Sequence, residues 1–175
     1  YIYNIYNKGN ILNFKIKQVF SELVIDLHPK YPIKGHADLV LKLDVDGEEQ
    51  IMLLDIKTIN TYSYSKKFGH KKNLDPNAQE HHKFQVGTYA LGVEHMFGRC
   101  DKIFMLYYKK DNSFLKLEEV DHSYIDKARE YWETMLNKER NGLPKLEKGM
   151  SPVYDWECKY CAFNEQCEED NKKGK

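Results

Sequence analysis

The sequence predicts an α/β protein, in which strand-like segments alternate with two long amphipathic helices. Residues 33–44 alternate apolar and polar side chains, and an Asp-Gly pair follows at positions 46 and 47, which is the pattern of a half-buried β-hairpin over residues 33–57. Residues 75–97 and 121–142 instead repeat their apolar side chains at helical spacing. A chain of 175 residues is long enough for one domain with a hydrophobic core.

The overall charge of the chain identifies no partner. It carries 27 Lys and Arg residues against 27 Asp and Glu residues, so any basic patch has to be local. No apolar run approaches the roughly 18 residues of a spanning helix, and no signal peptide is recognisable. We therefore expect a soluble, cytoplasmic protein with no membrane partner. Because the chain begins at Tyr1 and not at Met, we also expect residues upstream.

The first predicted element is a strand over residues 16–27, which ends before Pro29. Residues 1–15 are rich in aromatic residues and Asn, and they predict only a weak strand or irregular structure. Glu22 lies inside the predicted strand. Its carboxylate is either an additional metal ligand beside the following hairpin or, as is commoner, a solvated group on an edge strand.

The hairpin over residues 33–57 brings acidic and basic side chains together. The Asp-Gly pair at positions 46 and 47 suits a type I′ turn, which needs positive φ at both central residues. This register places Asp38 opposite Asp55 and His36 opposite Lys57. A three-residue loop would shift the pairing by one residue.

Two opposed carboxylates on neighbouring strands repel each other, and a divalent cation between them removes the repulsion. Hard cations such as Mg²⁺ and Mn²⁺ take carboxylate oxygens and bridge them to phosphate. Lys57 follows Asp55 by two residues, so its ammonium lies on the same face and can reach a phosphate or a water molecule there. Asp38, Asp55 and Lys57 thus predict metal-assisted attack on a phosphodiester. The alternative is an ordinary surface hairpin with a tolerated Asp pair and a solvated lysine.

Residues 58–73 predict a long polar loop, which mixes basic and aromatic side chains. These side chains are Lys66, Lys67, Lys71, Lys72, Tyr62, Tyr64, Phe68 and His70. Lysines that meet phosphates and rings that stack on bases suit a nucleic-acid strand. A solvated, mobile loop is the alternative.

An Asp-Pro pair at positions 75 and 76 predicts a helix start, and a glycine at 98 predicts its end. Within the helix, Gln85 and Tyr89 are four residues apart and share one face, with His81 or His82 a turn above. An amide and a phenol packed beside the carboxylates could hold a phosphate or orient the attacking water.

Residues 102–109 and 114–120 predict a second pair of strands, and residues 121–142 predict a final amphipathic helix capped by Asp121 or Ser123. The apolar side chains of this helix repeat at helical spacing, and the aromatic ones among them are expected in the core.

Three cysteines near the end of the chain, Cys158, Cys161 and Cys167, have a spacing that suits Zn²⁺ or an iron–sulfur cluster. Their clustering favours metal over disulfides. Either metal centre needs a fourth ligand. Cys100 more commonly fills a core position, so the fourth ligand is expected upstream of Tyr1.

Three short motifs occur in order along the chain, namely Gly35-x-x-Asp38, Asp55-x-Lys57 and Gln85-x-x-x-Tyr89. Together with the cysteine trio, this set resembles the PD-(D/E)xK nuclease superfamily over residues 16–167. The pattern is most similar to RecB-like exonucleases, including CRISPR-associated and phage-borne members.

The resemblance implies a mixed central sheet flanked by helices, with a restriction-endonuclease-like core. It implies that Asp38, Asp55 and the carbonyl of Ile56 hold Mg²⁺ or Mn²⁺, while Lys57 positions or activates water. It also implies that Gln85 and Tyr89 complete the site. The three cysteines would then close a [4Fe–4S] cluster, with Zn²⁺ as the alternative.

The resemblance further implies a metal-dependent DNA nuclease, an exonuclease on ends or single strands, with recombination, CRISPR or phage proteins as partners. Residues 1–157 are expected to form the nuclease-like domain, and residues 158–175 a cysteine-containing segment packed on it. The family's N-terminal helix with a metal-binding His is not recognisable, nor is a first cysteine near it, so the N-terminus is expected to be truncated or divergent. The alternative is a catalytically impaired DNA-binding or assembly module that keeps the fold.

Overall fold

The computed structural model describes residues 14–75, 78–141 and 158–173. The chain divides into two compact units, Tyr1–Glu133 and Thr134–Lys175. The first unit contains the sheet and every residue of the predicted active site.

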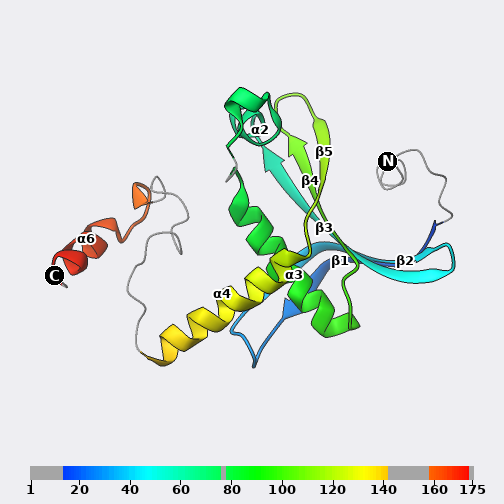
Figure 1. Cartoon of the computed structure of the whole chain (residues 1–175), viewed down its shortest axis with the longest axis horizontal. Helices are drawn as coiled ribbons and strands as arrows, with labels where there is room; N and C mark the ends of the chain where they lie inside the picture. Colours follow the sequence, from blue (N-terminus) through cyan, green and yellow to red (C-terminus); the bar gives the residue numbers. More distant parts are fainter. Residues whose placement is uncertain (1–13, 76–77, 142–157, 174–175) are drawn as a thin grey trace. The chain divides into compact units, whose positions relative to one another are not determined.

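One five-stranded mixed sheet, in the order β1-β2-β3-β4-β5, organises the first unit (Figure 1). Its strands are β1 Phe14–Asp26, β2 Lys34–Val45, β3 Glu48–Ile59, β4 Lys102–Lys109 and β5 Phe114–Glu119. All neighbours are antiparallel except β3 and β4, which are parallel. A parallel pair requires a crossover connection, and three helical segments supply it: α2 Thr61–Phe68, η1 Lys71–Asn73 and α3 Glu80–Phe97. The predicted mixed sheet with flanking helices is confirmed.

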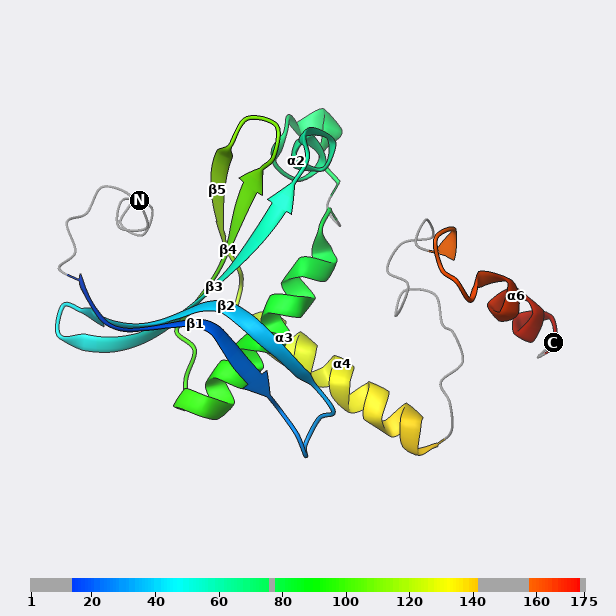
Figure 2. The same ribbon diagram turned by 180° about the vertical axis from the view of Figure 1, so that it is seen from behind.

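Helix α3 lies between the sheet and α4, which spans Ser123–Arg140 (Figures 1 and 2). Two glycines of α3 allow these close approaches. A Cβ on Gly92 would lie 2.2 Å from Ile25 of β1, and a Cβ on Gly87 would lie 2.4 Å from the Tyr124 carbonyl of α4. Any larger residue at either position would push α3 away from its neighbour.

The predicted polar loop over residues 58–73 is wrong, because most of it is helical. The side chain of Asn60 accepts a hydrogen bond from the Ser63 N–H at 2.8 Å and so caps α2. Oδ2 of Asp111, in the β4–β5 turn, accepts another from the Thr61 N–H at 2.7 Å. Two of the otherwise unpaired N–H groups at the start of α2 are thereby satisfied.

The predicted start of α3 is also wrong, whereas its end is right. The helix begins at Glu80, and Asp75 instead forms a turn in which its carbonyl accepts from the Ala78 N–H at 3.0 Å. Pro76 lies outside the described residues. At the other end Gly98 has a φ of 78°, the left-handed conformation that glycine adopts at low cost.

The two predicted strands after α3 are confirmed as β4 and β5. The final helix is confirmed as α4; the glycine at its predicted end lies outside the described residues. In the second unit, residues Asn164–Lys173 form α6. Among the described residues no helix combines the length and apolar character needed to cross a membrane.

Candidate active site

The turn between β2 and β3 sets the register of the acidic residues. Positions 46 and 47 have φ angles of 52° and 90°, as a type I′ turn requires. The ladder then runs from Val45 and Glu48 to Leu39 and Leu54. The predicted register is confirmed over this whole ladder.

The ladder ends one step before Asp38 and Asp55, so these two residues are not a paired step of the sheet. Instead, Oδ2 of Asp38 accepts a hydrogen bond from the Ile56 N–H at 2.6 Å. The side chain of Asp38 thus takes a backbone group that the ladder leaves unpaired. This hydrogen bond ties Asp38 to the residue that follows Asp55.

The alternation of side chains along β1 changes beside Asp38. Phe20 stacks on a phenylalanine of α3, and Ile25 packs on a glycine of α3, although an odd and an even position of a regular strand point to opposite faces. Between them Glu22 has a φ of 51°, and it lies opposite Asp38 between two paired steps. Its side chain is exposed, which favours the solvated alternative over a metal ligand.

Asp55 is almost completely buried, with 1% of its surface exposed. Burial raises the pKa of this carboxyl above its ordinary value, the attraction of Lys57 opposes that shift, and the charge of Asp38 adds to it. The Lys57 ammonium lies 2.8 Å from Oδ2 of Asp55, yet that oxygen receives no hydrogen bond of ordinary geometry. The carboxylate is therefore short of partners, and an additional cation would stabilise its ionised form.

The predicted pair on α3, Gln85 and Tyr89, forms as expected: Nε2 of Gln85 donates to Oη of Tyr89 at 2.9 Å. The ring of Tyr89 packs on Gly35, where a Cβ would lie 3.0 Å from Cε1. Gly35 therefore lets α3 approach the strand that carries Asp38. Within the described chain, neither Gln85 nor Tyr89 hydrogen-bonds to an acidic residue of the hairpin, and their roles stay predictions.

Two further residues lie beside the site, His82 and Tyr107. Tyr107 is the β4 partner of Lys57, and its hydroxyl lies 3.3 Å from Nδ1 of His82 on α3. Burial, together with the positive charges of His81, Lys57 and Lys67, lowers the pKa of His82 to about 3, so the imidazole is neutral at ordinary pH. Burial, together with nearby carboxylates that include Asp55, raises the pKa of Tyr107.

Sequence reasoning missed Tyr107, because the β3–α3–β4 crossover brings together residues 50 positions apart. The only signal for His82 was its position one turn before Gln85.

The residues present fit a divalent cation. Asp38 and Asp55 offer carboxylate oxygens, the ligand type of Mg²⁺ and Mn²⁺, and the buried Oδ2 of Asp55 receives no hydrogen bond from the described residues that would compete with a cation. In the described ranges, no group of three or more His, Cys, Asp and Glu side chains could hold a metal ion. A cation at Asp38 and Asp55 would thus depend on a further ligand such as the predicted carbonyl of Ile56, whose role stays a prediction.

The cysteines behave as two separate sets. Cys100 is buried, and burial raises the pKa of its thiol to about 12, which agrees with a core position. In the second unit, the Cys161 N–H donates to the Cys158 carbonyl at 3.1 Å, and the Phe163 N–H donates to Sγ of Cys161 at 3.4 Å. Cys167 follows at the start of α6. The metal centre predicted for the trio, and its packing on the first unit, stay predictions.

Comparison with known proteins identifies the family to which this chain belongs. A sequence model of the PD-(D/E)XK nuclease superfamily matches residues 9–168. The crystal structure of SSO0001 is similar over 89% of this chain and 60% of its own, with 24% identity and a TM-score of 0.41. That of a "Putative exonuclease" from Eubacterium rectale is similar over 84% of this chain and 51% of its own, with 14% identity and a TM-score of 0.47. This chain spans less than two thirds of either protein, and no curated protein matches it significantly.

Proposed function

The chain belongs to the PD-(D/E)XK nuclease superfamily, and from this premise we propose that it is a metal-dependent DNA nuclease. It hydrolyses phosphodiester bonds with water as the nucleophile. It acts as an exonuclease on DNA ends or single strands. Its cation is Mg²⁺ or Mn²⁺.

The observation that carries this proposal is the placement of Asp38, Asp55 and Lys57 at the open end of the β2–β3 ladder. Asp38 is fixed by the Ile56 N–H at 2.6 Å, and Asp55 by the Lys57 ammonium at 2.8 Å. A structural hairpin gains nothing from burying a carboxylate whose pKa is raised by burial and by a second carboxylate. A site that binds a cation and a phosphate does gain from it.

Each residue then has a defined task. Asp38 and Asp55, with the carbonyl of Ile56, would hold the cation, which supplies a nucleophile from water and neutralises charge on the phosphate. Lys57 is 19% exposed at its side chain, so its ammonium can meet a phosphate oxygen or orient the attacking water while it remains next to Asp55. Gln85 and Tyr89 bound the site from α3 and hold the scissile phosphate.

The test compares Lys57→Ala with Lys42→Ala, a lysine on β2 in the turn half of the hairpin. Both are assayed on linear single-stranded, linear double-stranded and closed circular DNA with Mg²⁺, Mn²⁺ or EDTA. We expect Lys57→Ala to lower the cleavage rate by roughly 100-fold or more, and Lys42→Ala to retain it. We expect only the linear substrates to be degraded.

Three results would contradict the proposal. Wild-type rates in Lys57→Ala would remove the catalytic assignment. Equal cleavage of circular DNA would replace the exonuclease with an endonuclease. DNA binding without cleavage in either metal would favour the non-catalytic binding or assembly module.

We also propose that Cys158, Cys161 and Cys167 hold a [4Fe–4S] cluster, with Zn²⁺ as the competing metal. All three are thiols, and the N–H donated to Sγ of Cys161 would stabilise a thiolate there. The test is iron, sulfide and zinc analysis with a visible spectrum after anaerobic purification. A colourless protein with stoichiometric zinc would contradict the cluster, and a protein with no metal would contradict both.

A further inference from the structure

The segment Thr61–Asn73, which comprises α2 and η1, is the most basic stretch beside the active site. It contains Lys66, Lys67, Lys71 and Lys72 and no acidic residue, in a chain whose positive and negative residues balance. It begins four residues after Lys57, immediately beyond the end of β3. Figures 1 and 2 both show α2 at this end of the sheet, next to β4 and β5.

One lysine of the segment points inward and anchors it. The side chain of Lys67 is only 6% exposed, and its ammonium lies 2.9 Å from Oε2 of Glu118 on β5. The same ammonium lies 5.3 Å and 5.4 Å from the ring centroids of Phe68 and Tyr107. Phe68 also packs edge-on against Tyr107, the β4 partner of Lys57. The segment is therefore bound to the strands of the active site.

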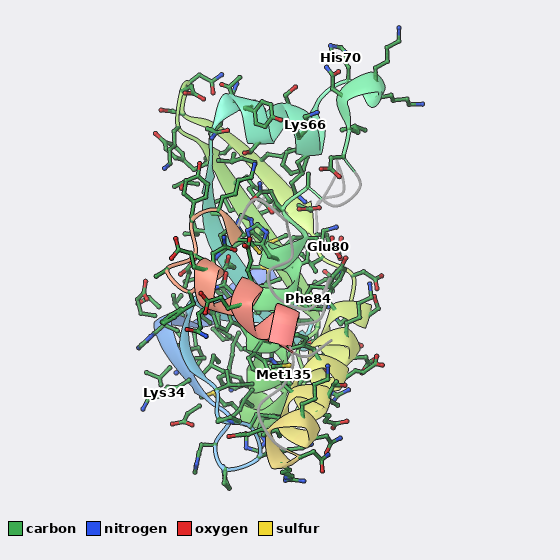
Figure 3. The ribbon with its side chains drawn as sticks, turned by 90° about the vertical axis from the view of Figure 1, so that its left-hand side faces the viewer. Lys34, Lys66, His70, Glu80, Phe84 and Met135 are labelled. Carbon is green, nitrogen blue, oxygen red and sulfur yellow. The ribbon has the colours of Figure 1, made fainter. Side chains whose placement is uncertain are left out.

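The other cationic side chains of the segment face outward. Lys71 and Lys72 are exposed, and Lys66 lies half-buried with its ammonium 5.8 Å from the ring of Tyr62. Tyr62 itself is 72% exposed. In the part of the chain that the structure describes, no carboxylate forms an ion pair with these three lysines. Figure 3 shows Lys66 and His70 on this segment, beyond the N-terminal end of α3 where Glu80 is labelled.

We propose that Lys66, Lys71, Lys72 and Tyr62 form a contact surface for a single strand of DNA that passes through the active site. An unpaired cluster of lysines attracts phosphates, and an exposed ring beside it offers a base a stacking partner. The proposal rests on the proposed function, because it takes the strand to be the substrate. The surface is narrower than the sequence prediction, which also included Lys67, Tyr64, Phe68 and His70. Lys67 is excluded because it neutralises Glu118, and the rings of Tyr64 and Phe68 are excluded because they pack against each other and against the strands.

The reach of the surface follows from chain geometry. Strand and helix rises place Lys72, the far end of the surface, at most about 35 Å along the backbone from Lys57. A stacked strand advances about 3.4 Å per nucleotide, so the surface lies within roughly ten nucleotides of the scissile phosphate. An oligonucleotide of about 12 nucleotides is long enough to occupy both.

The experiment measures binding of a labelled single-stranded oligonucleotide of this length by anisotropy, in EDTA, from about 50 to about 200 mM salt. The test variant replaces Lys66, Lys71 and Lys72 by Gln. The charge-matched control replaces Lys15, Lys17 and Lys127 by Gln. Lys15 and Lys17 are exposed on β1 beside the β2–β3 turn, and Lys127 is exposed on α4. Tyr62→Ala and Tyr62→Phe test stacking.

Each phosphate that is no longer neutralised lowers the slope of log affinity against log salt by about 0.7, so we expect the slope of the test variant to fall by about two. The same relation gives a roughly 100-fold weaker affinity at 0.1 M salt. The control should keep the wild-type slope. Tyr62→Ala should bind DNA roughly tenfold more weakly, and Tyr62→Phe should bind it as wild type does. Lys67→Gln should lower the melting temperature and leave the slope unchanged.

Cleavage with Mn²⁺ separates this inference from the proposed function. We expect the test variant to reach the wild-type rate at saturating DNA, with only its KM raised. A wild-type chain that cleaves DNA while the test variant keeps the full slope and affinity would overturn the surface and leave the nuclease standing. A wild-type chain that does not cleave, with a reduced slope in the test variant, would overturn the nuclease and leave the surface standing. Equal reductions of the slope in test and control variants would overturn the surface.

Discussion

The most informative perturbation is at Asp38, because its carboxylate has two separable duties. It accepts a hydrogen bond from the Ile56 N–H at 2.6 Å, and it is the second carboxylate, beside Asp55, of the proposed cation site. Asp38→Asn keeps an oxygen acceptor for the N–H and removes the charge. Asp38→Ala removes both. Asp44→Asn, also on β2 but at its turn end and paired with Lys17, is the matched control.

The magnitudes follow from the hydrogen bond. A hydrogen bond to a charged acceptor contributes about 1.5–3 kcal/mol, and a neutral one about 1 kcal/mol. One kcal/mol shifts the melting temperature of a domain of this size by about 2–4 °C. We therefore expect Asp38→Ala to melt roughly 3–12 °C below wild type in EDTA. Asp38→Asn should lie between wild type and Asp38→Ala.

The assay pairs thermal melts in EDTA with cleavage of linear DNA in Mn²⁺. We expect both Asp38 variants to lose cleavage, and Asp44→Asn to retain it. Wild-type cleavage by Asp38→Asn would refute the catalytic assignment. Equal melting temperatures for Asp38→Asn and Asp38→Ala would refute the structural role of the hydrogen bond.

Three further predictions concern the neighbours of Asp38. Because the folded pKa of Asp55 is raised, its ionised form destabilises the metal-free protein as pH rises through that pKa, so Asp55→Asn should raise the melting temperature at neutral pH in EDTA. Added Mn²⁺ should stabilise the wild type and not Asp55→Asn. Equal stabilisation of the two proteins by Mn²⁺ would contradict this prediction. The folded pKa of His82 is lowered to about 3, so its contribution to the free energy of unfolding is fully present above the unfolded pKa of 6.5 and is lost as pH falls from 6.5 toward 3. Urea titrations over this pH range should therefore show a smaller loss of stability in His82→Gln than in the wild type. Gly35→Ala would bring a Cβ to 3.0 Å from the Tyr89 ring, so it should lower stability by about 1 kcal/mol and also lower the cleavage rate. Adding Tyr89→Leu to Gly35→Ala should restore stability but not cleavage.

Local chain chemistry was sufficient to predict the parts of this protein that depend on few neighbours. The Asp-Gly pair at positions 46 and 47, with the alternation of residues 33–44 before it, predicted the register from Val45–Glu48 to Leu39–Leu54. Gly98 predicted the end of α3, because a left-handed residue is cheapest at glycine. In each case the deciding energy lies within a few residues of the chain.

The same local rules failed where a second signal competed with them. The Asp-Pro pair at positions 75 and 76 predicted a helix start, but the Asp75 N–H donates to the Lys66 carbonyl at 2.9 Å and the helix begins later, at Glu80. Asn60 caps α2, although the polar composition of residues 58–73 predicted a loop. The start of α3 depends on a contact across the fold, whereas the cap of α2 lies within the local sequence.

The sequence by itself determined which residues could form the active site: the order and spacing of Asp38, Asp55 and Lys57 follow from one hairpin. Only the tertiary structure decided which groups surround them, how deeply they are buried and how their charges are paired. The β3–α3–β4 crossover places Tyr107 next to Lys57, burial raises the pKa of Asp55, and an ion pair with Glu118 removes Lys67 from the basic surface. The physical reason is that desolvation and Coulomb energies depend on every group within several ångströms, and most of those groups are distant in the sequence.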